Sequence, residues 1–158
     1  RVKTVIGGEE RSDSVLAGLA HLLSCADPQD WVLVHDAARP CLQPADIERL
    51  IEAVIAGSTG GILAQPIVDT VKQASADALV VRTLDRATLW RAQTPQMFRL
   101  GELHRALQEA QQRGLVVTDE ASAMQLVVGP AANLKVTVPA DLPLAAWYLQ
   151  AAVEGVPA

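Results

Sequence analysis

The stretch WVLVHDAARPCLQPADIERLIEAVIAG, residues 31–57, decides the fold class of this chain. It opens with residues 31–35, which are apolar up to a terminal histidine, as in a strand buried on both faces. After a polar turn, residues 44–56 carry apolar side chains at helical spacing, with Pro44 in the first turn and Gly57 at the end. A buried strand that leads into an amphipathic helix is typical of an α/β protein.

The same alternation extends outward in both directions. Further strands are expected at 61–64 and 133–138. Further helices are expected at 14–24, with Ser12 as the N-cap, and at 102–113, 119–127 and 141–153. Aliphatic strands that alternate with amphipathic helices predict a mostly parallel sheet with helices on both faces. Ligands then bind at the carboxyl ends of the strands.

Residues 66–93 interrupt this alternation. They contain a polar DTVK segment at 69–72, an expected turn at 75–77 and a strand-like segment at 79–83. They also hold four of the thirteen basic residues, namely Lys72, Arg82, Arg86 and Arg91. We expect these residues to form a hairpin arm that projects from the domain.

Composition limits the class of protein. The 158 residues are 50% hydrophobic and 20% charged, which is enough apolar material for the core of one compact domain. The net charge of −5 and the 3% aromatic content argue against a protein that binds nucleic acid through bulk charge and base stacking. Cys25 and Cys41 have neither zinc-ligand nor disulfide-scaffold spacing, so both are expected to be reduced thiols without a role.

Polar residues at the end of the 31–35 strand form the first candidate site. Asp36 and Arg39 lie where the chain turns toward the 44–56 helix, and a carboxylate near a guanidinium at such an edge can bind hydroxyls, a metal or phosphate. The same spacing also suits a local ion pair that only fixes the loop. His35 is expected to be a hydrogen-bonded residue of the strand end with no catalytic role.

Two further segments have polar residues in unusual places. The glycines of GGEERSDS, residues 7–14, would let a ligand approach the backbone, although an ordinary strand-to-helix connection has the same pattern. Lys135 lies within an apolar strand pattern, where an ammonium group needs solvent or an anion. The sequence has no signal for nucleophilic or zinc hydrolysis, whereas phosphoryl or nucleotidyl transfer by positioned cations suits its residues.

Six motifs in register resemble one family. They are GGEERSDSV (7–15), VHDAARP (34–40), DTVK (69–72), QTPQMF (93–98), TDEASA (118–123) and NLKVT (133–137). In this order and spacing they resemble the 2-C-methyl-D-erythritol 4-phosphate cytidylyltransferases of the non-mevalonate isoprenoid pathway. Alditol-phosphate cytidylyltransferases, such as the ribitol-5-phosphate enzyme, are the nearest alternative.

The resemblance implies a Rossmann-like nucleotidyltransferase fold and transfer of CMP from CTP to 2-C-methyl-D-erythritol 4-phosphate. The products are 4-diphosphocytidyl-2-C-methyl-D-erythritol and pyrophosphate, and the acceptor phosphate is the nucleophile. Mg²⁺ is expected to be held mainly through the CTP phosphates, with no metal ligand assigned in this chain. The resemblance also implies a homodimer in the bacterial cytoplasm or the plastid stroma, with neither nucleic acid nor a membrane as a partner.

The resemblance gives expected roles to individual residues. Those that would contact the cytosine are Gly8, Glu9 and Ser14. Those that would contact the polyol phosphate or the ribose are Asp36, Arg39, Thr94 and Thr118. The expected catalytic residues are Lys135, which would orient the acceptor, and Arg86. Thr70 and Arg86 belong to the arm and would hold the acceptor's phosphate in the active site of the other subunit.

The sequence also departs from the family's pattern. The family has a glycine-rich loop, followed by an arginine and a lysine, that cradles the CTP triphosphate, and this loop does not occur here. Residues 1–158 are therefore expected to be the C-terminal two thirds of a single nucleotidyltransferase domain, with a dimerisation arm at about 66–93. A chain that started at Arg1 would be expected to have negligible turnover, or to be a non-catalytic dimeric fragment. Smaller departures are Glu9, in place of a frequent aspartate, and the VPAD segment at 138–141, in place of a more polar one.

Overall fold

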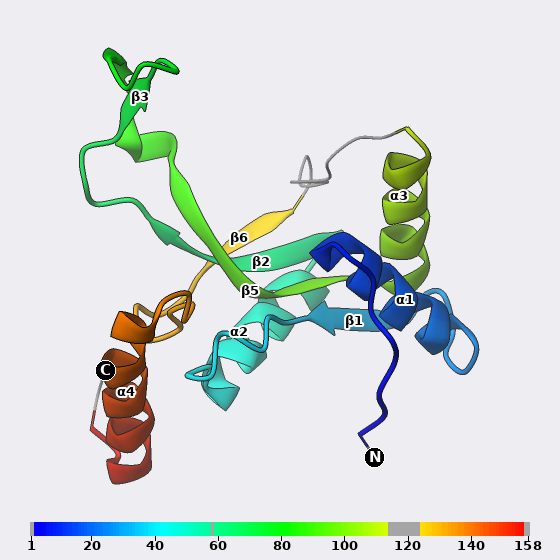
Figure 1. Cartoon of the computed structure of the whole chain (residues 1–158). Helices are drawn as coiled ribbons and strands as arrows, with labels where there is room; N and C mark the ends of the chain where they lie inside the picture. Colours follow the sequence, from blue (N-terminus) through cyan, green and yellow to red (C-terminus); the bar gives the residue numbers. More distant parts are fainter. Residues whose placement is uncertain (1, 58, 114–123, 157–158) are drawn as a thin grey trace.

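The computed structural model describes residues 2–57, 59–113 and 124–156 (Figure 1). Helices and strands alternate along most of the chain, which confirms the α/β class. In chain order the elements are α1 (Arg11–Leu23), β1 (Trp31–Val34), α2 (Pro44–Ile55), β2 (Gly60–Pro66), β3 (Lys72–Ala74), β4 (Val80–Thr83), the 3-10 helix η1 (Arg86–Thr88), β5 (Trp90–Arg99), α3 (Leu100–Gln112), β6 (Gln125–Val128), the 3-10 helix η2 (Pro139–Asp141) and α4 (Leu142–Glu154).

Four strands form the central sheet, in the order β1-β5-β2-β6. The pairing of β2 with β6 is parallel, whereas β5 runs antiparallel to both of its neighbours. Strands β1, β2 and β6 therefore point in one direction, which agrees with the predicted parallel arrangement of the 31–35 and 61–64 strands. The prediction of a mostly parallel sheet is wrong in one respect. Strand β5 is reversed, and it makes two of the three strand pairings antiparallel.

Alternate side chains of the sheet face two different helical layers. Val32 and Val34 of β1 pack with α1 and α3 around the buried Leu19 and Leu100. On the opposite face, the β1 side chains of odd number pack with α2 around Leu50, Val54, Leu63 and Met97. Because successive residues of a strand point to opposite faces, a short apolar strand supplies both layers. The prediction of helices on both faces is confirmed.

The bounds of α2, α3 and α4 lie within two residues of the predicted ones, whereas α1 starts three residues earlier than predicted. The N-cap of α1 is Glu10 instead of the expected Ser12, and the helix begins at Arg11. The physical reason is Asp13, whose Oδ2 accepts the Glu10 amide at 3.2 Å and so caps the chain two residues earlier. Helix α2 begins at Pro44 as predicted.

Two expected elements toward the end of the chain are corrected. Residues 133–138 are irregular instead of a strand, and a Val136 amide that donates to the Ala38 carbonyl at 2.8 Å ties them to the loop after β1. The strand that lies beside β2 is instead β6, at residues 125–128. Residues 125–127, expected in a helix, belong to β6, and the expected helix start at 119–123 lies outside the described residues.

A hairpin arm projects from the sheet, as predicted (Figure 1). Strands β3 and β4 pair only with each other, and every residue in both is exposed. The Ile67 amide donates to the Leu89 carbonyl at 3.0 Å and closes the base of the hairpin. Trp90 already pairs with Pro66 of β2, so the arm spans 67–89 instead of 66–93.

The described helices are all too short, or too polar, to cross a membrane.

Candidate functional site

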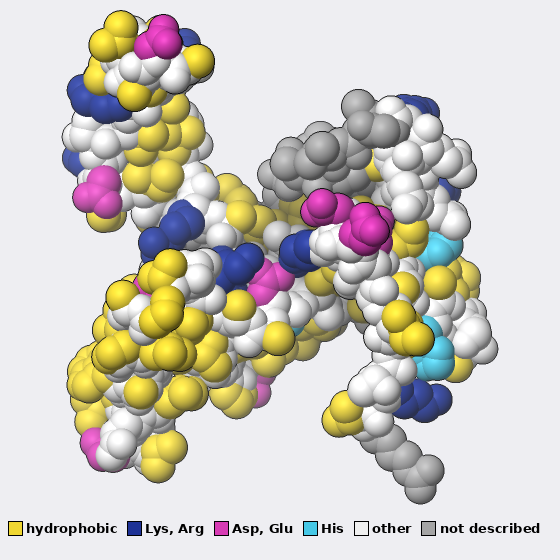
Figure 2. All heavy atoms as spheres, in the orientation of Figure 1, with side chains coloured by type: hydrophobic (Ala, Val, Ile, Leu, Met, Phe, Trp, Pro, Cys, Tyr) yellow, Lys and Arg dark blue, Asp and Glu magenta, His cyan; other side chains and the backbone are white. Residues whose placement is uncertain are grey.

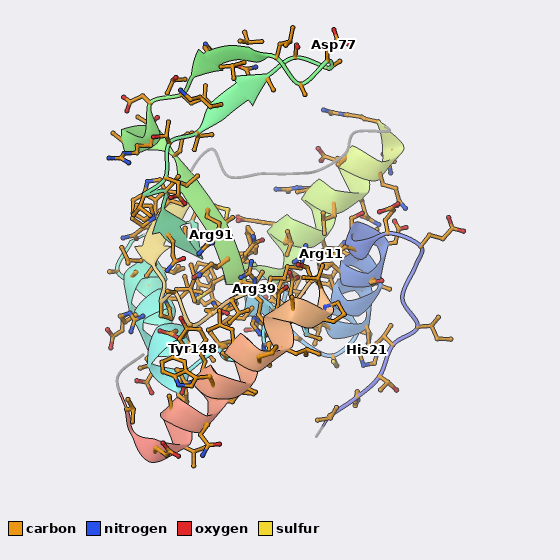
Figure 3. The ribbon with its side chains drawn as sticks, turned by 60° about the vertical axis from the view of Figure 1, so that its left-hand side comes forward. Arg11, His21, Arg39, Asp77, Arg91 and Tyr148 are labelled. Carbon is orange, nitrogen blue, oxygen red and sulfur yellow. The ribbon has the colours of Figure 1, made fainter. Side chains whose placement is uncertain are left out.

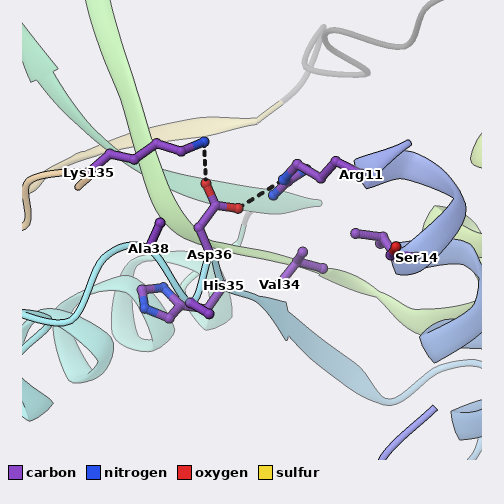
Figure 4. Close-up of a pocket in the computed structure, with 9 residues that line it drawn as sticks. Arg11, Ser14, Val34, His35, Asp36, Ala38 and Lys135 are labelled. Carbon is purple, nitrogen blue, oxygen red and sulfur yellow. Dashed lines mark hydrogen bonds and ion pairs between the residues drawn. The ribbon is translucent and has the colours of Figure 1, made fainter. Parts of the chain in front are cut away.

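The loop after β1 places a carboxylate between two cations. This loop turns at once, because the Arg39 amide donates to the Asp36 carbonyl at 2.9 Å. Nε of Arg11, at the start of α1, donates to Oδ1 of Asp36 at 2.8 Å, and Nζ of Lys135 lies 3.1 Å from Oδ2 (Figure 4). One side chain thus joins the carboxyl end of β1 to α1 and to the segment before α4.

Asp36 is ionised in this arrangement. Burial works to raise the pKa of its carboxyl group, since only 14% of the side chain is exposed. The hydrogen bonds and positive charges of Arg11 and Lys135 outweigh that effect and hold the pKa below its ordinary value. The Asp36 carboxylate therefore accepts hydrogen bonds at neutral pH and does not donate them.

A cavity of about 380 Å³ opens at this carboxylate. Its walls are the start of α1, the loop after β1 and the Lys135 side chain, and its lining includes Arg11, Ser14, His35, Asp36 and Lys135 (Figure 4). The cavity lies at the carboxyl end of β1, the position that the sequence predicts for a ligand. The sequence predicts that the ammonium group of Lys135 needs solvent or an anion. It has both, because the side chain is half exposed and is paired with the Asp36 carboxylate.

Arg39 does not form the local ion pair with Asp36 that its spacing allowed. Its Nη1 donates to the Asn133 carbonyl at 2.7 Å and its Nη2 to the Ala92 carbonyl at 3.3 Å. Burial lowers the pKa of Arg39, the charge of Asp36 raises it, and the charges of Arg91 and Arg11 lower it, with a net decrease. Asp36 and Arg39 therefore come from one turn but are held by different partners.

Positive charge collects on this face of the molecule. Figure 2 shows Lys and Arg side chains in a row across the middle, between the arm above and α4 below. In the turned view, Arg91, Arg39 and Arg11 lie across the same region (Figure 3). The whole chain carries a charge of −5, so this face is a local exception that favours an anionic ligand.

Thr94 lies behind the loop instead of in the cavity. It is 4% exposed, and its Oγ1 accepts the Asp36 amide at 3.0 Å. The same oxygen is 3.0 Å from Nδ1 of His35. The Thr94 hydroxyl therefore holds the backbone of Asp36 from behind the loop.

Two of the three residues expected at the cytosine, Gly8 and Ser14, lie together. The Gly8 amide donates to Oγ of Ser14 at 3.2 Å. A Cβ on Gly7 would lie 2.4 Å from that oxygen, and a Cβ on Gly8 would lie 2.3 Å from Cβ of Asp13, so both glycines allow the close approach of this turn to α1. Glu9 is exposed beside them.

The structure does not bring the arm residues to this cavity within one chain. Thr70 and Arg86 are exposed at the base of the arm, and Nη1 of Arg86 donates to the Val68 carbonyl. Neither residue lines the cavity. Thr118 lies outside the described residues.

Two residues of the site have no predicted role, Arg11 and Asn133. A cation in the first turn of a helix opposes the helix dipole, which is a signal that Arg11 needs a carboxylate partner. Asn133 is fully buried, its Nδ2 donates to the Thr94 carbonyl at 2.7 Å and its own carbonyl accepts from Arg39. A buried asparagine in an apolar run is a signal for such a network.

The described side chains at this site do not form a metal-binding set. Within the described ranges no three His, Cys, Asp or Glu side chains come together as a metal site. Both carboxylate oxygens of Asp36 are occupied by Arg11 and Lys135. These residues do not fit a metal ion held by the protein alone.

Comparisons with known proteins identify the family of this chain. The family model of IspD, 2-C-methyl-D-erythritol 4-phosphate cytidylyltransferase, matches residues 1–151. A protein of that name from Vibrio parahaemolyticus is 52% identical over 152 residues, with 92% of this chain and 64% of the relative covered. Another from Pseudomonas aeruginosa is 53% identical over 149 residues, with 89% and 64% covered.

The fold agrees as well. The crystal structure of the Francisella tularensis 2-C-methyl-D-erythritol 4-phosphate cytidylyltransferase superimposes with a TM-score of 0.80 at 41% identity, over 90% of this chain and 69% of that one. The chain spans about two thirds of the length of the relatives it matches. With its sequence matched almost from end to end, this chain belongs to the family of 2-C-methyl-D-erythritol 4-phosphate cytidylyltransferases.

Proposed function

We propose that the protein transfers CMP from CTP to 2-C-methyl-D-erythritol 4-phosphate and releases pyrophosphate. The observation that carries the proposal is the bridge from Arg11 through Asp36 to Lys135 across the cavity, in a chain of this family. Two substrates with several phosphate groups need cations, and a polyol needs an acceptor for its hydroxyl protons. The site holds both kinds of group.

In the proposed reaction, an oxygen of the acceptor phosphate attacks the α-phosphorus of CTP. A new P–O bond forms while the bond to the oxygen shared with the β-phosphate breaks, and pyrophosphate leaves with that electron pair. The nucleophile is already ionised, so the protein's task is to place two anions together and to stabilise charge in the transition state. Lys135 and Arg39 are the proposed cations of this chain near the acceptor.

The other residues have roles that follow from their places. Asp36, kept ionised by its two partners, would accept hydrogen bonds from the polyol or the ribose. The turn at Gly8, with Glu9 and Ser14, would contact the cytosine from the start of α1. Thr94 would act through Asp36, and Thr118 keeps the role that the resemblance gives it.

We further propose a homodimer in which the arm completes the partner's site. The supporting observations are that Arg86 and Thr70 are exposed on the projecting arm and stand outside the cavity of their own chain. Mg²⁺ would enter on the CTP phosphates and supply charge neutralisation, since the described residues offer no ligand cluster. The relatives named above are bacterial, and a cytoplasmic location is proposed because CTP is made there.

The test is an acceptor-dependent assay on the protein as its gene encodes it, after its intact mass has been measured. With CTP and Mg²⁺, we expect pyrophosphate release that requires 2-C-methyl-D-erythritol 4-phosphate. D-Ribitol 5-phosphate is the matched acceptor, and a higher kcat/KM for it would move the protein to the ribitol-phosphate class. Calorimetry with CTP adds a readout without turnover. No CTP binding and no pyrophosphate release would overturn the proposal.

A further inference from the structure

Four polar groups behind Asp36 form a one-way chain of hydrogen bonds. The Asp36 amide donates to Oγ1 of Thr94 at 3.0 Å. That hydroxyl is 3.0 Å from Nδ1 of His35, and Nε2 of His35 is 3.1 Å from the Arg39 carbonyl. The chain begins and ends in the same loop, residues 36–39, and its two middle members are side chains.

The donors and acceptors in this chain follow from chemistry. A carbonyl oxygen only accepts, so Nε2 of His35 carries the proton that is given to Arg39. A neutral imidazole then has an acceptor at Nδ1, and the Thr94 hydroxyl must donate to it. The lone pair of the same hydroxyl receives the Asp36 amide. The hydrogen bonds through the Thr94 hydroxyl and the His35 ring thus all run in the same donor-to-acceptor direction. Hydrogen bonds in such a chain polarise and strengthen one another.

This chain of hydrogen bonds fixes the loop at two points, Asp36 and Arg39. Thr94 belongs to β5 and is 4% exposed, so it provides a rigid anchor. Through it, the loop is fastened at Asp36, whose carboxylate faces the cavity, and through His35 it is fastened at Arg39, whose guanidinium lies on the Asn133 and Ala92 carbonyls. Loss of His35 would free the Arg39 end of the loop and leave the Thr94 proton without an acceptor.

We propose that His35 is a positioning residue for the acceptor site, in the tautomer protonated at Nε2. Its role there is to hold the Asp36 and Arg39 ends of the loop through these hydrogen bonds. The inference rests on the proposed function, which assigns the acceptor to these two side chains. It also explains why a histidine stands at a strand end where any hydrogen-bonding residue would satisfy the sequence pattern.

The first experiment needs no turnover. In the ¹⁵N-labelled protein, His35 is expected to show the nitrogen shifts of the Nε2–H tautomer, with His21 and His104 as internal references. In Thr94→Val, the Nδ1 signal of His35 should move toward that of a nitrogen without a hydrogen bond, while Nε2 stays protonated. An Nδ1–H tautomer would overturn the inference even if the enzyme is active. His35 ring nitrogen shifts that are unchanged in Thr94→Val would overturn it as well.

The second experiment separates the two hydrogen bonds of the ring. An asparagine at position 35 can accept from Thr94, whereas a glutamine can reach the Arg39 carbonyl. His35→Ala is expected to raise KM for the acceptor about five- to tenfold, with each of His35→Asn and His35→Gln restoring part of the loss and KM for CTP changed less than twofold. His104→Ala, in α3, is the control and should match wild type. Equal losses for acceptor and CTP would contradict a positioning role, whereas absent turnover in wild type would count only against the proposed function.

Discussion

Nζ of Lys135 lies 3.1 Å from Oδ2 of Asp36, so the irregular segment before α4 is tied to the loop after β1. Arg11 holds the other carboxylate oxygen from the start of α1. These three residues come from distant parts of the sequence, and their geometry sets the charge of the cavity.

Removal of the charge on Asp36 should strengthen anion binding. In Asp36→Asn, Arg11 and Lys135 no longer face a carboxylate, and one charge at about 4 Å contributes roughly 1 kcal/mol in water. Inorganic pyrophosphate is therefore expected to bind about fivefold more tightly in low salt, by calorimetry, with the gain reduced in high salt. Asp77→Asn, at the tip of the arm (Figure 3), is the control. Weaker binding by Asp36→Asn would show that the carboxylate does not offset these cations.

The stability contribution of Asp36 should depend on pH. Its pKa in the folded state is below the ordinary value of 3.8, so the unfolded chain takes up the proton first as the pH falls. The difference in free energy of unfolding between wild type and Asp36→Asn is expected to be complete above that ordinary value and to disappear as the pH falls through the folded-state pKa. Urea unfolding between pH 7 and acid conditions measures it. A difference that grows as the pH falls would have the wrong sign.

Arg86→Ala should weaken use of the acceptor far more than binding of CTP. The guanidinium belongs to the exposed arm, so its loss leaves the cavity of its own chain intact. Initial rates with varied acceptor, and CTP calorimetry, give the two effects separately. Equal losses of both would count against the assigned role.

Mixed subunits test the exchange of the arm. Arg86→Ala chains combined with Lys135→Ala chains should recover roughly a quarter of wild-type activity, because half of the dimers are mixed and each has one complete site. Each variant alone is the control. Mixed dimers that form but stay inactive would exclude a shared site.

Asn133→Ala should destabilise the fold. It removes the Nδ2 donor from the buried Thr94 carbonyl, which typically costs about 1–3 kcal/mol. Gln150→Ala, on an exposed turn of α4, is the matched control and should lie within about 0.5 kcal/mol of wild type in urea unfolding. A neutral Asn133→Ala would mean that the segment before α4 is held by other contacts.

Two glycine substitutions should have opposite signs. A Cβ on Gly61 would lie 2.5 Å from Cγ2 of Val54 and 3.1 Å from Cδ1 of Leu50, so Gly61→Ala is expected to cost about 1–3 kcal/mol. Gly18 lies within α1 and nothing approaches its Cβ position within 4 Å, so Gly18→Ala should add about 0.5–1 kcal/mol. Thermal unfolding of both variants decides the point, and shifts of the same sign would contradict the packing described here.

The elements with a clear period were predictable. The apolar run of β1 and the helical spacing of α2 each depend on side chains within the element, so local sequence suffices. Strand β5 was not predicted as a strand, because Gln93 and Thr94 are polar yet buried. Their hydrogen-bond partners, at Pro130, Asn133, His35 and Asp36, are distant in sequence, and only the folded chain brings them together.

The site divides in the same way. By itself, the sequence determined the α/β class, the projecting arm and the family, because these follow from local periods and from motifs in register, and it predicted roles for Asp36, Arg39 and Lys135. Only the tertiary structure decided that Asp36 pairs with Arg11 and Lys135 instead of Arg39, and that Thr94 stands behind the loop. A carboxylate near several cations pairs with those that come within about 3 Å. The packing of α1 and of the segment before α4 brings Arg11 and Lys135 to that distance, and spacing along the chain does not fix it.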